Sequence, residues 1–410
     1  MNRAIPPLLA VLLGFSLLVA PIVAAPGNSL SATPNSSLQQ LSTADGSDSD
    51  LQVLENTTNR LWLKNAARSE HARPSYGVGT MLASMDDEIQ ADHAQYAIVD
   101  RGFDDATAEE KRVMLRDAFD RIKERSDAIE SRERRAVRAH ANGALSSSRL
   151  LETLLRNYEE AAVLSKSLEK LDDRSSGVSN SSLPIEDEQG RLEMHRTEAR
   201  SQLAAATRGQ ERTDSETTVT VETSENGYVI SMLNENYVRE AVRFDNRNVS
   251  EPSQFSGLTD AYQYTLEMYP WANETRSSPS FNMHTTVQLY KLDISHDHGH
   301  LQTYLDGGTS DIYREAQFLN HDSLPVASQQ PVTKGGLDLM VNKTVGDGPS
   351  ELIVSDSETS ELRSATISIN GAEVGKTGAD GTLWFVPPGG GYELTVETTT
   401  GKRISTSISG

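Results

Sequence analysis

Two consecutive stretches of the chain carry apolar residues at alternating spacings of three and four. The first extends from Leu115 to Ala136 and is interrupted by the polar residues Ser126 and Glu133, and the second extends from Leu150 to Leu171. This spacing places the apolar side chains on one face of a helix. The Asn142-Gly143 pair ends the first helix in a left-handed turn and leaves only a short loop before the second. We therefore predict an antiparallel helical hairpin.

The helical part of the chain has a defined beginning and a further helix at its end. Thr107 and Glu110 form a capping box, in which the hydroxyl and the carboxylate satisfy free amide groups at the helix entry. A linker over residues 174–184 is followed by another helical pattern over residues 185–208. These features assign a helical domain to residues 51–213.

From Thr217 onward the pattern changes to an alternation of apolar and polar residues, which is typical of half-buried strands. The sequence Glu225-Asn226-Gly227 is a hairpin-turn signal. An amphipathic helix is predicted over residues 258–268 and is ended by Pro270. Residues 214–322 are therefore expected to form a domain with a mostly antiparallel sheet. The predicted strands are 217–223, 228–233, 237–244, 285–294, 301–305 and 312–318.

The last part of the chain carries short alternating segments separated by turn sequences. Strands at 365–369 and 392–396 lie among the turns Asn370-Gly371, Asp380-Gly381 and Pro387-Pro388-Gly389. This spacing predicts a small Ig-like β-sandwich over residues 336–410. The Pro/Gln/Ser-rich residues 323–335 are interpreted as a linker. The predicted fold class is a multidomain α+β protein with a helical bundle, a middle antiparallel sheet domain and a C-terminal sandwich.

The first 50 residues are predicted to lie outside these domains. Residues 1–25 have the pattern of a signal peptide, because Arg3 precedes an apolar core from Leu8 to Val19 and small residues precede Pro26. An uncleaved membrane anchor is the alternative, although the apolar core is short for a spanning helix. Residues 26–50 are rich in Ser, Thr and Asp without periodicity, which predicts a disordered stalk. We expect a protein that is secreted or held at the cell surface.

The charge of the chain narrows the choice of environment and partner. The 38 Lys and Arg residues against 59 Asp and Glu residues give a formal net charge of −21. This excess disfavours nucleic acid as a partner, because phosphates are bound by clustered basic residues. Only 10 of the basic residues are Lys, and an acidic, Lys-poor surface suits molar salt, where the Debye length is about 3 Å. The expected source is a halophilic archaeon, and an acidic protein from a non-halophile is the alternative.

Covalent modification is limited by the absence of cysteine, which excludes disulfides, a thiolate metal site and a lipid-modified cysteine. Six Asn-x-Ser/Thr sequences are candidate glycosylation sites, which in an exported protein would mark surface loops. Chance occurrence in a chain rich in Asn, Ser and Thr is the alternative. The six asparagines are Asn35, Asn56, Asn180, Asn248, Asn273 and Asn342.

A histidine-rich sequence from Ser295 to His300 is the strongest candidate for a chemical site. Imidazoles at alternate positions of a strand share a face. His296, His298 and His300 could then bind zinc and leave a fourth position for water, as in a metal-dependent extracellular hydrolase. The alternative, which we favour, is that Asp297-His298-Gly299 is a hairpin turn that spreads the rings apart. We predict no cofactor, and the chain contains no GxSxG, HExxH or phosphate-binding sequence.

Two parts of the chain resemble known families. The stretch ATISINGAEVGKTGADGTLWFVPPGGGYELTV (residues 365–396) resembles the Ig-like modules called carboxypeptidase-regulatory-like or Cna-B-like, which implies a stalk, spacer or adhesion domain. The segments YVREAVRFDNRNV, GHLQTYLDGGTSDIYREAQFL and LDLMVNKTVGDGP look like those of a family of haloarchaeal exported proteins. That likeness covers most of the chain. The family has no assigned activity, so the resemblance implies only the location and the modular layout.

These observations together predict a non-catalytic protein with a structural or binding role at the cell envelope. The apolar face from Leu115 to Ala136, called the helical seam below, is interrupted by the polar residues Ser126 and Glu133. These interruptions indicate that the helical seam is completed by a partner. That partner would be another envelope or surface protein, or a second copy of the chain meeting it through the helical hairpin. Contact with the membrane is expected only if the signal segment stays uncleaved.

Overall fold

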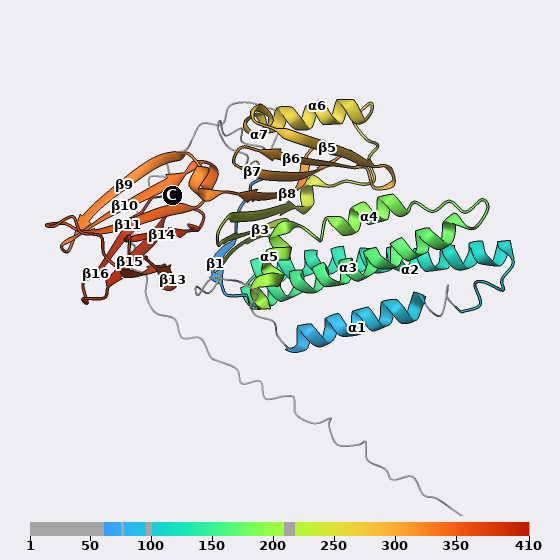
Figure 1. The fold of residues 1–410 in the computed structure, drawn as a ribbon, viewed down its shortest axis with the longest axis horizontal. Coiled ribbons are helices and arrows are strands. Elements are labelled where there is room, and N and C mark those ends of the chain that lie inside the picture. The colour runs from blue at the N-terminus through green and yellow to red at the C-terminus, as the bar shows by residue number, and fades with distance from the viewer. Residues whose placement is uncertain (1–60, 75–77, 96–100, 209–217, 410) are drawn as a thin grey trace, which may run out of the picture. The chain divides into compact units, whose positions relative to one another are not determined.

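The computed structural model describes residues 61–74, 78–95, 101–208 and 218–409. The predicted signal peptide and stalk, together with Asn35 and Asn56, lie outside the described residues. The described chain runs from helices through a large sheet to a β-sandwich, which confirms the predicted multidomain α+β class (Figure 1). No helix within those residues is long and apolar enough to cross a membrane.

The helical part of the described chain forms the predicted hairpin with smaller helices around it. These helices are α1 (Val78–Gln95), α2 (Ala108–Ala141), α3 (Ser147–Ser176), α4 (Ile185–Glu193) and α5 (Glu198–Thr207). The alternating residues of α2 from Leu115 to Ala136 are all buried, and so are those of α3 from Leu150 to Leu171. α2 and α3 pack along one another (Figure 1). The three-four spacing therefore identified the buried faces correctly.

The ends of α2 form as the sequence predicts. The backbone amide of Glu110 donates to the Thr107 hydroxyl at 3.3 Å, and the Thr107 amide donates to the Glu110 carboxylate at 2.8 Å. This reciprocal pair satisfies two free donors of the first helical turn. At the other end Asn142 caps the helix, and Gly143 follows with a φ of +74°, a backbone conformation that other residues rarely adopt.

The single helix predicted over residues 185–208 is wrong, because the segment forms two helices. α4 ends at Glu193, and α5 begins at Glu198 with Thr197 as its N-cap. The hydroxyl of Thr197 accepts from the backbone amide of Arg200 at 3.4 Å. A capping threonine starts a new helix because its side chain replaces the carbonyl that a continuing helix would supply. The break turns the chain so that the residues around it face the sheet.

The middle of the chain is one eight-stranded sheet in the order β1-β2-β3-β4-β8-β7-β6-β5, and neighbouring strands pair antiparallel. Its strands are β1 (Arg68–Ala72), β2 (Val219–Ser224), β3 (Gly227–Leu233), β4 (Tyr237–Arg243), β5 (Ser277–His284), β6 (Leu289–His296), β7 (Gly299–Asp306) and β8 (Ile312–Leu319). β1 precedes all the helices of the described residues. The boundary predicted at residue 214 therefore does not separate the helices from the sheet completely, because β1 belongs to the sheet but lies before that residue.

Both faces of the sheet are covered. On one face Val221, Tyr228 and Ile230 share a core with residues of α3 and α5 such as Leu154 and Leu203. The opposite face packs against α6 (Leu258–Met268) and α7 (Pro270–Glu274), which lie across it in Figure 1. Central strands are consequently buried on both sides, and every residue of β4 is buried. Charged residues in these strands can lie only in the interior.

The C-terminal part is a sandwich of two four-stranded sheets, with strand orders β14-β11-β10-β9 and β13-β12-β15-β16. Its strands are β9 (Val326–Lys334), β10 (Leu337–Thr344), β11 (Ser350–Asp356), β12 (Ala365–Ile369), β13 (Ala372–Lys376), β14 (Thr382–Phe385), β15 (Tyr392–Thr398) and β16 (Arg403–Ile408). The predicted sandwich is confirmed, and its core contains Leu339, Val354, Ile367 and Val396.

Besides β1, which falls in the predicted helical domain, two strands are missing from the prediction, and all three lie at sheet edges. Residues 323–335 were predicted as a linker but contain β9, and β5 falls in a segment with no predicted strand. Nearly all side chains of these two strands are exposed or half-buried. An edge strand is held mainly by backbone hydrogen bonds to one neighbour, so its sequence need not alternate.

Candidate functional site: a buried charge network

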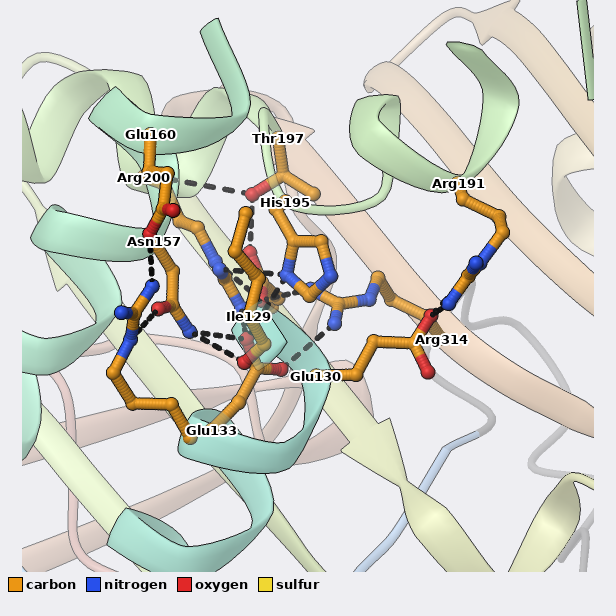
Figure 2. Close-up of polar contacts among 12 residues, drawn as sticks. Ile129, Glu130, Glu133, Asn157, Glu160, Arg191, His195, Thr197, Arg200 and Arg314 are labelled. Carbon is orange, nitrogen blue, oxygen red and sulfur yellow. Dashed lines mark hydrogen bonds and ion pairs between the residues drawn. The ribbon is translucent and has the colours of Figure 1, made fainter. Parts of the chain in front are cut away.

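Four charged side chains from four different elements meet between the helices and the sheet. Glu133 comes from α2, Arg200 from α5, Glu240 from β4 and Arg314 from β8, and each is at most 1% exposed. The two guanidinium groups lie between the two carboxylates, so the formal charges balance. Figure 2 shows Glu133, Arg200 and Arg314 converging on one point.

The distances show that both arginines bridge both glutamates. Arg314 donates to Glu133 Oε1 at 2.8 Å and to Glu240 Oε1 at 2.7 Å. Arg200 donates to Glu133 Oε2 at 2.7 Å and lies 3.0 Å from Glu240 Oε1. Charge-assisted contacts of this length are about twice as strong as neutral hydrogen bonds. The bridging requires α2, α5, β4 and β8 to hold fixed positions relative to one another.

Three polar residues complete the hydrogen bonds of this centre. The hydroxyl of Thr197 donates to Glu240 Oε2, and His195 Nδ1 lies 3.1 Å from Glu133 Oε2. The Tyr228 hydroxyl accepts from Arg200 Nη2 at 2.5 Å and donates to Glu240 Oε1 at 2.5 Å. All four carboxylate oxygens of Glu133 and Glu240 therefore have partners. His195 and Thr197 reach the centre because they occupy the break between α4 and α5.

A second group of ion pairs extends from this centre along the helices. Asn157 of α3 links the two groups, because its amide donates to Glu133 Oε2 at 3.4 Å and accepts from Arg132 Nε at 2.7 Å. Glu160 then binds Arg125 at 2.7 Å as well as Arg132, and these contacts join α2 to α3. The chain of ion pairs continues through Asp87 of α1, which pairs with Arg125 and Arg156.

A third group holds α4 against α2. Arg191 of α4 donates to Asp127 at 2.6 Å and to Glu130 at 2.9 Å, both on α2, and Figure 2 shows its contact with Glu130. It also pairs with Glu188 one turn earlier on its own helix. Arg191 is 6% exposed, so these contacts are largely protected from solvent. The same side chain therefore ties two helices together at the edge of the centre.

The electrostatics of the centre follow from burial and the two arginines. Burial alone would raise the pKa of Glu133, yet the guanidinium groups of Arg200 and Arg314 hold that pKa well below its usual value. The pKa of Glu240 is lowered by the same two groups against the same effect of burial. Burial lowers the pKa of His195, which favours its neutral form. The centre thus carries two carboxylates, two guanidinium groups and a neutral imidazole.

This arrangement suits a structural role. A catalytic carboxylate or histidine must reach substrate, whereas these side chains are buried and bind one another. Removing one member would leave an opposite charge unpaired in the interior, which is strongly destabilising. The network therefore fixes how the helices sit on the sheet.

The structure does not bring the three candidate zinc ligands together. His296 ends β6, His298 lies in the turn and His300 lies on β7, as expected if the sequence is a hairpin. The His298 ring stacks on Trp271 at 4.3 Å, whereas His300 Nε2 pairs with Asp293 at 3.1 Å. No group of three or more His, Cys, Asp or Glu side chains among the described residues is placed to hold a metal ion.

The candidate glycosylation sites differ in exposure. Asn180 and Asn248 are exposed, and Asn273 is half-buried on α7. Asn342 is only 7% exposed, and its amide donates to Glu351 at 2.8 Å. Asn342 alternates with the core residues Leu339 and Val341, so it lies on the outer face of its sheet, where its side chain is hydrogen-bonded to the neighbouring strands. Glycosylation at the described asparagines stays a prediction.

The polar interruptions of the helical seam also have a different environment from the one expected. Ser126 and Glu133 are both 1% exposed within this chain, and Glu133 is the residue that joins α2 to the sheet. A partner is not needed to complete the seam at either position. The expectation of a partner at the hairpin therefore loses the observation on which it was based.

Comparison with known proteins places the chain in a family. Residues 1–212, more than half of the chain, match the domain of unknown function DUF7096. The chain belongs to this family. In this DUF7096 protein, residues 219–325 match the family of unknown function DUF7094, and residues 328–405 match an archaeal fibronectin-III type-like domain. No curated protein and no solved structure matches. An archaeal protein with a C-terminal Ig-like module fits these matches.

The network crosses the boundary between the first two matched regions. Glu133 and Arg200 belong to the DUF7096 region, and Glu240 and Arg314 belong to the DUF7094 region. The two regions also share one hydrophobic core, and β1 of the DUF7096 region pairs with β2 of the DUF7094 region. In this protein the two regions form one structural unit.

Sequence reasoning missed Arg200, Glu240 and Arg314 as members of the site. A signal for two of them was present, because β4 and β8 each carry Arg-Glu-Ala after two apolar residues that begin the strand. Successive residues of a strand face opposite sides of the sheet. Glu240 and Arg314 accordingly face the helices, while Arg239 and Glu315 form a 2.7 Å ion pair on the other face.

Proposed function

We propose that this DUF7096 protein is a non-catalytic structural or binding protein, exported to the envelope of a halophilic archaeon. The observation that carries the proposal is the C-terminal β-sandwich that matches an archaeal fibronectin-III type-like domain. Modules of this architecture serve many cell-surface proteins as spacers and binding domains. The buried network supports the same role, since it commits the most prominent cluster of ionisable groups to holding the helices on the sheet.

Export is supported by the signal-peptide pattern of residues 1–25 and by the net charge of −21. The test is to express the full chain with a C-terminal epitope tag in a haloarchaeal host and treat intact cells with a salt-tolerant protease. We expect the tag to be lost from intact cells, while a cytoplasmic marker survives. Mass spectrometry of the mature protein should find a new N-terminus near Pro26. A protected tag on a chain that begins at Met1 and fractionates with the cytoplasm would refute export.

The non-catalytic part of the proposal is tested by metal analysis. The full chain, purified in molar salt without a chelator, should hold no stoichiometric zinc, and His298→Ala should give the same result. His321→Ala serves as a matched control, because it removes another histidine next to a tryptophan. A zinc ion that disappears in His298→Ala and persists in His321→Ala would contradict the proposal and favour a metal-dependent hydrolase.

The binding role is tested by retention. Tagged protein should remain with the envelope fraction at high salt and be recovered together with envelope components after mild crosslinking. A variant that ends at residue 325 and lacks the sandwich should be released into the medium. Equal retention of both chains would show that the sandwich is not the part that holds the protein at the envelope.

A further inference from the structure

Two loops of the chain, far apart in sequence, have the same conformation. The first runs from Asp306 to Asp311 with the sequence DGGTSD and joins β7 to β8. The second runs from Asp356 to Glu361 with the sequence DSETSE and follows β11 in the sandwich. Both follow the pattern Asp-x-x-Thr-Ser-acid. They lie in two differently folded parts of the chain and can be compared residue by residue.

The backbone hydrogen bonds of the two loops correspond. In each loop the first aspartate donates its amide to the carbonyl five residues later at 2.9 Å. It also accepts at its own carbonyl from the serine four residues later, again at 2.9 Å. That serine has a left-handed backbone in both, with φ of 61° at Ser310 and 58° at Ser360.

One carboxylate oxygen of the first aspartate plays the same part in both loops. Asp306 Oδ1 accepts from the amides of Gly308 at 3.1 Å and Thr309 at 3.0 Å. Asp356 Oδ1 accepts from the amides of Glu358 at 3.1 Å and Thr359 at 3.3 Å. The aspartate is required in each loop because its Oδ1 closes the turn.

The other carboxylate oxygen differs between the loops. Asp356 Oδ2 lies 3.2 Å from Lys402 Nζ and 3.4 Å from an Arg363 nitrogen, so its charge is matched by cations. Asp306 is 0% exposed, and none of the described residues donates to its Oδ2. A buried carboxylate oxygen without a partner is strongly unfavourable. Within the described part of the chain, Asp306 Oδ2 therefore lacks the hydrogen-bonding cations that Asp356 Oδ2 has in Lys402 and Arg363.

The surroundings of Asp306 are rich in oxygen atoms. A Cβ on Gly308 would lie 2.2 Å from the Asn248 carbonyl oxygen and 3.3 Å from that of Glu251, so backbone oxygens crowd the loop. Asp311, at the far end of the loop, is half-buried. Buried carboxylate and carbonyl oxygens of this kind favour an added cation.

We propose that the Asp306–Asp311 loop binds a calcium ion through Asp306 Oδ2, with Asp311 as the second carboxylate. Calcium accepts six to eight oxygen ligands in flexible geometry, including carboxylates, backbone carbonyls and water. A site with two carboxylates therefore needs no third acidic or histidine side chain, consistent with the absence of such groups of three among the described residues. The site is independent of the proposed envelope function, because it stabilises the hairpin between β7 and β8 whatever the protein binds.

The test measures unfolding of the full chain with calcium added back after chelation, in potassium chloride at constant ionic strength. Calcium should raise the melting temperature, with stabilisation growing as RT ln(1 + [Ca²⁺]/Kd). Asp306→Asn should abolish the calcium-dependent rise, because the amide retains an oxygen for the turn and loses the charge. Asp356→Asn is the matched control, which should lower the melting temperature yet keep the full calcium response.

A second variant keeps the test decisive if Asp306→Asn does not fold. Asp311→Asn lies at the half-buried end of the loop and should weaken calcium binding at least tenfold, measured by calorimetric titration. The proposal is overturned if wild-type protein shows no calcium response, or if Asp306→Asn and Asp311→Asn both respond as wild type does. A response to magnesium equal to that to calcium would also overturn it. None of these outcomes changes the interpretation of the export and retention experiments.

Discussion

The interior between the helices and the sheet and the interior of the β-sandwich are stabilised in different ways. The first contains Glu133, Arg200, Glu240 and Arg314 among its apolar residues, whereas the core between the two sheets of the sandwich is apolar. Apolar cores accept many residues of the right size. A buried charge, in contrast, accepts only an arrangement that brings its partners within hydrogen-bonding distance. The sandwich is therefore expected to tolerate substitution, whereas the helix–sheet interior specifies one arrangement.

The largest expected effect comes from breaking the network at its centre. Arg314→Met leaves Glu133 and Glu240 with Arg200 as their only shared cation, and should reduce the free energy of unfolding by about 3–5 kcal/mol. The measurement is denaturant unfolding in constant high salt, followed by helical circular dichroism. Arg149→Met is the control, because Arg149 pairs with Glu152 but is 65% exposed, and it should cost less than about 1 kcal/mol. Equal losses of stability in the two variants would show that the buried network is no more sensitive to substitution than an exposed ion pair.

A cavity in the sandwich should have a slightly smaller and local effect. Ile367 is 0% exposed in the sandwich core, and Ile367→Ala should cost about 2–5 kcal/mol there. Limited proteolysis should find faster cleavage in residues 326–409, while the helical unfolding transition stays in place. Thr366→Ala, on the half-buried side of the same strand, is the control. A shift of the helical transition by Ile367→Ala would mean that the two interiors unfold together.

A smaller effect is expected at the break between α4 and α5. Thr197→Ala removes the cap of α5 and the hydroxyl that donates to Glu240, and should cost about 1–2 kcal/mol. Thr197→Ser keeps a hydroxyl and should recover most of the loss. Denaturation under the same conditions as for Arg314→Met measures both variants. A serine variant that is no more stable than the alanine variant would contradict the role given to the Thr197 hydroxyl.

The smallest effect is a pH dependence that begins at a higher pH in the helix–sheet unit than in the sandwich. The pKa of His195 is lowered from its usual 6.5, so the unfolded chain takes up a proton before the folded protein does. Stability is therefore complete above pH 6.5 and falls as the pH drops below it. Glu133 and Glu240 have pKa values lowered from 4.5 and add a further loss below that pH. In the sandwich, the pKa of Asp356 is lowered from 3.8 to about 2. This group therefore reduces the stability of the sandwich only when the pH falls below 3.8.

The pH experiment compares melting temperatures of the helical transition from neutral to acid pH in wild type and His195→Gln. His71, His140, His284 and His296 also have pKa values lowered by burial and contribute to the same trend in both chains. His195→Gln should flatten the slope just below pH 6.5. An unchanged slope would show that His195 does not titrate differently on unfolding.

Periodicity predicted those parts of the fold in which burial repeats along the chain. The seam from Leu115 to Ala136 and the alternation of β12 are examples, because the pattern in each follows from one buried face. The edge strands β5 and β9 were missed because backbone pairing, with few buried side chains, holds them. The hydrophobic pattern carries no information about such strands.

The charge network was beyond prediction for a different reason. Glu133 was identified as a polar interruption, but the arginines that pair with it, Arg200 and Arg314, are 67 and 181 residues away. A single sequence shows which charges are placed in apolar surroundings and does not show which of them meet. The partner expected for Glu133 turned out to be the sheet of the same chain.

The position of β1 has a consequence for how the chain folds. Ala72 of β1 pairs with Val219 of β2, so the five helices α1 to α5 lie in the loop that this one strand pairing closes. Closing a long loop costs chain entropy before the contacts it permits can form, and such contacts slow folding. As the chain leaves the ribosome, the α2–α3 hairpin can form from local contacts, whereas β1 must wait for β2 to be synthesised. The edge of the sheet at β1 is therefore expected to be completed late, because it cannot form before β2 has been synthesised.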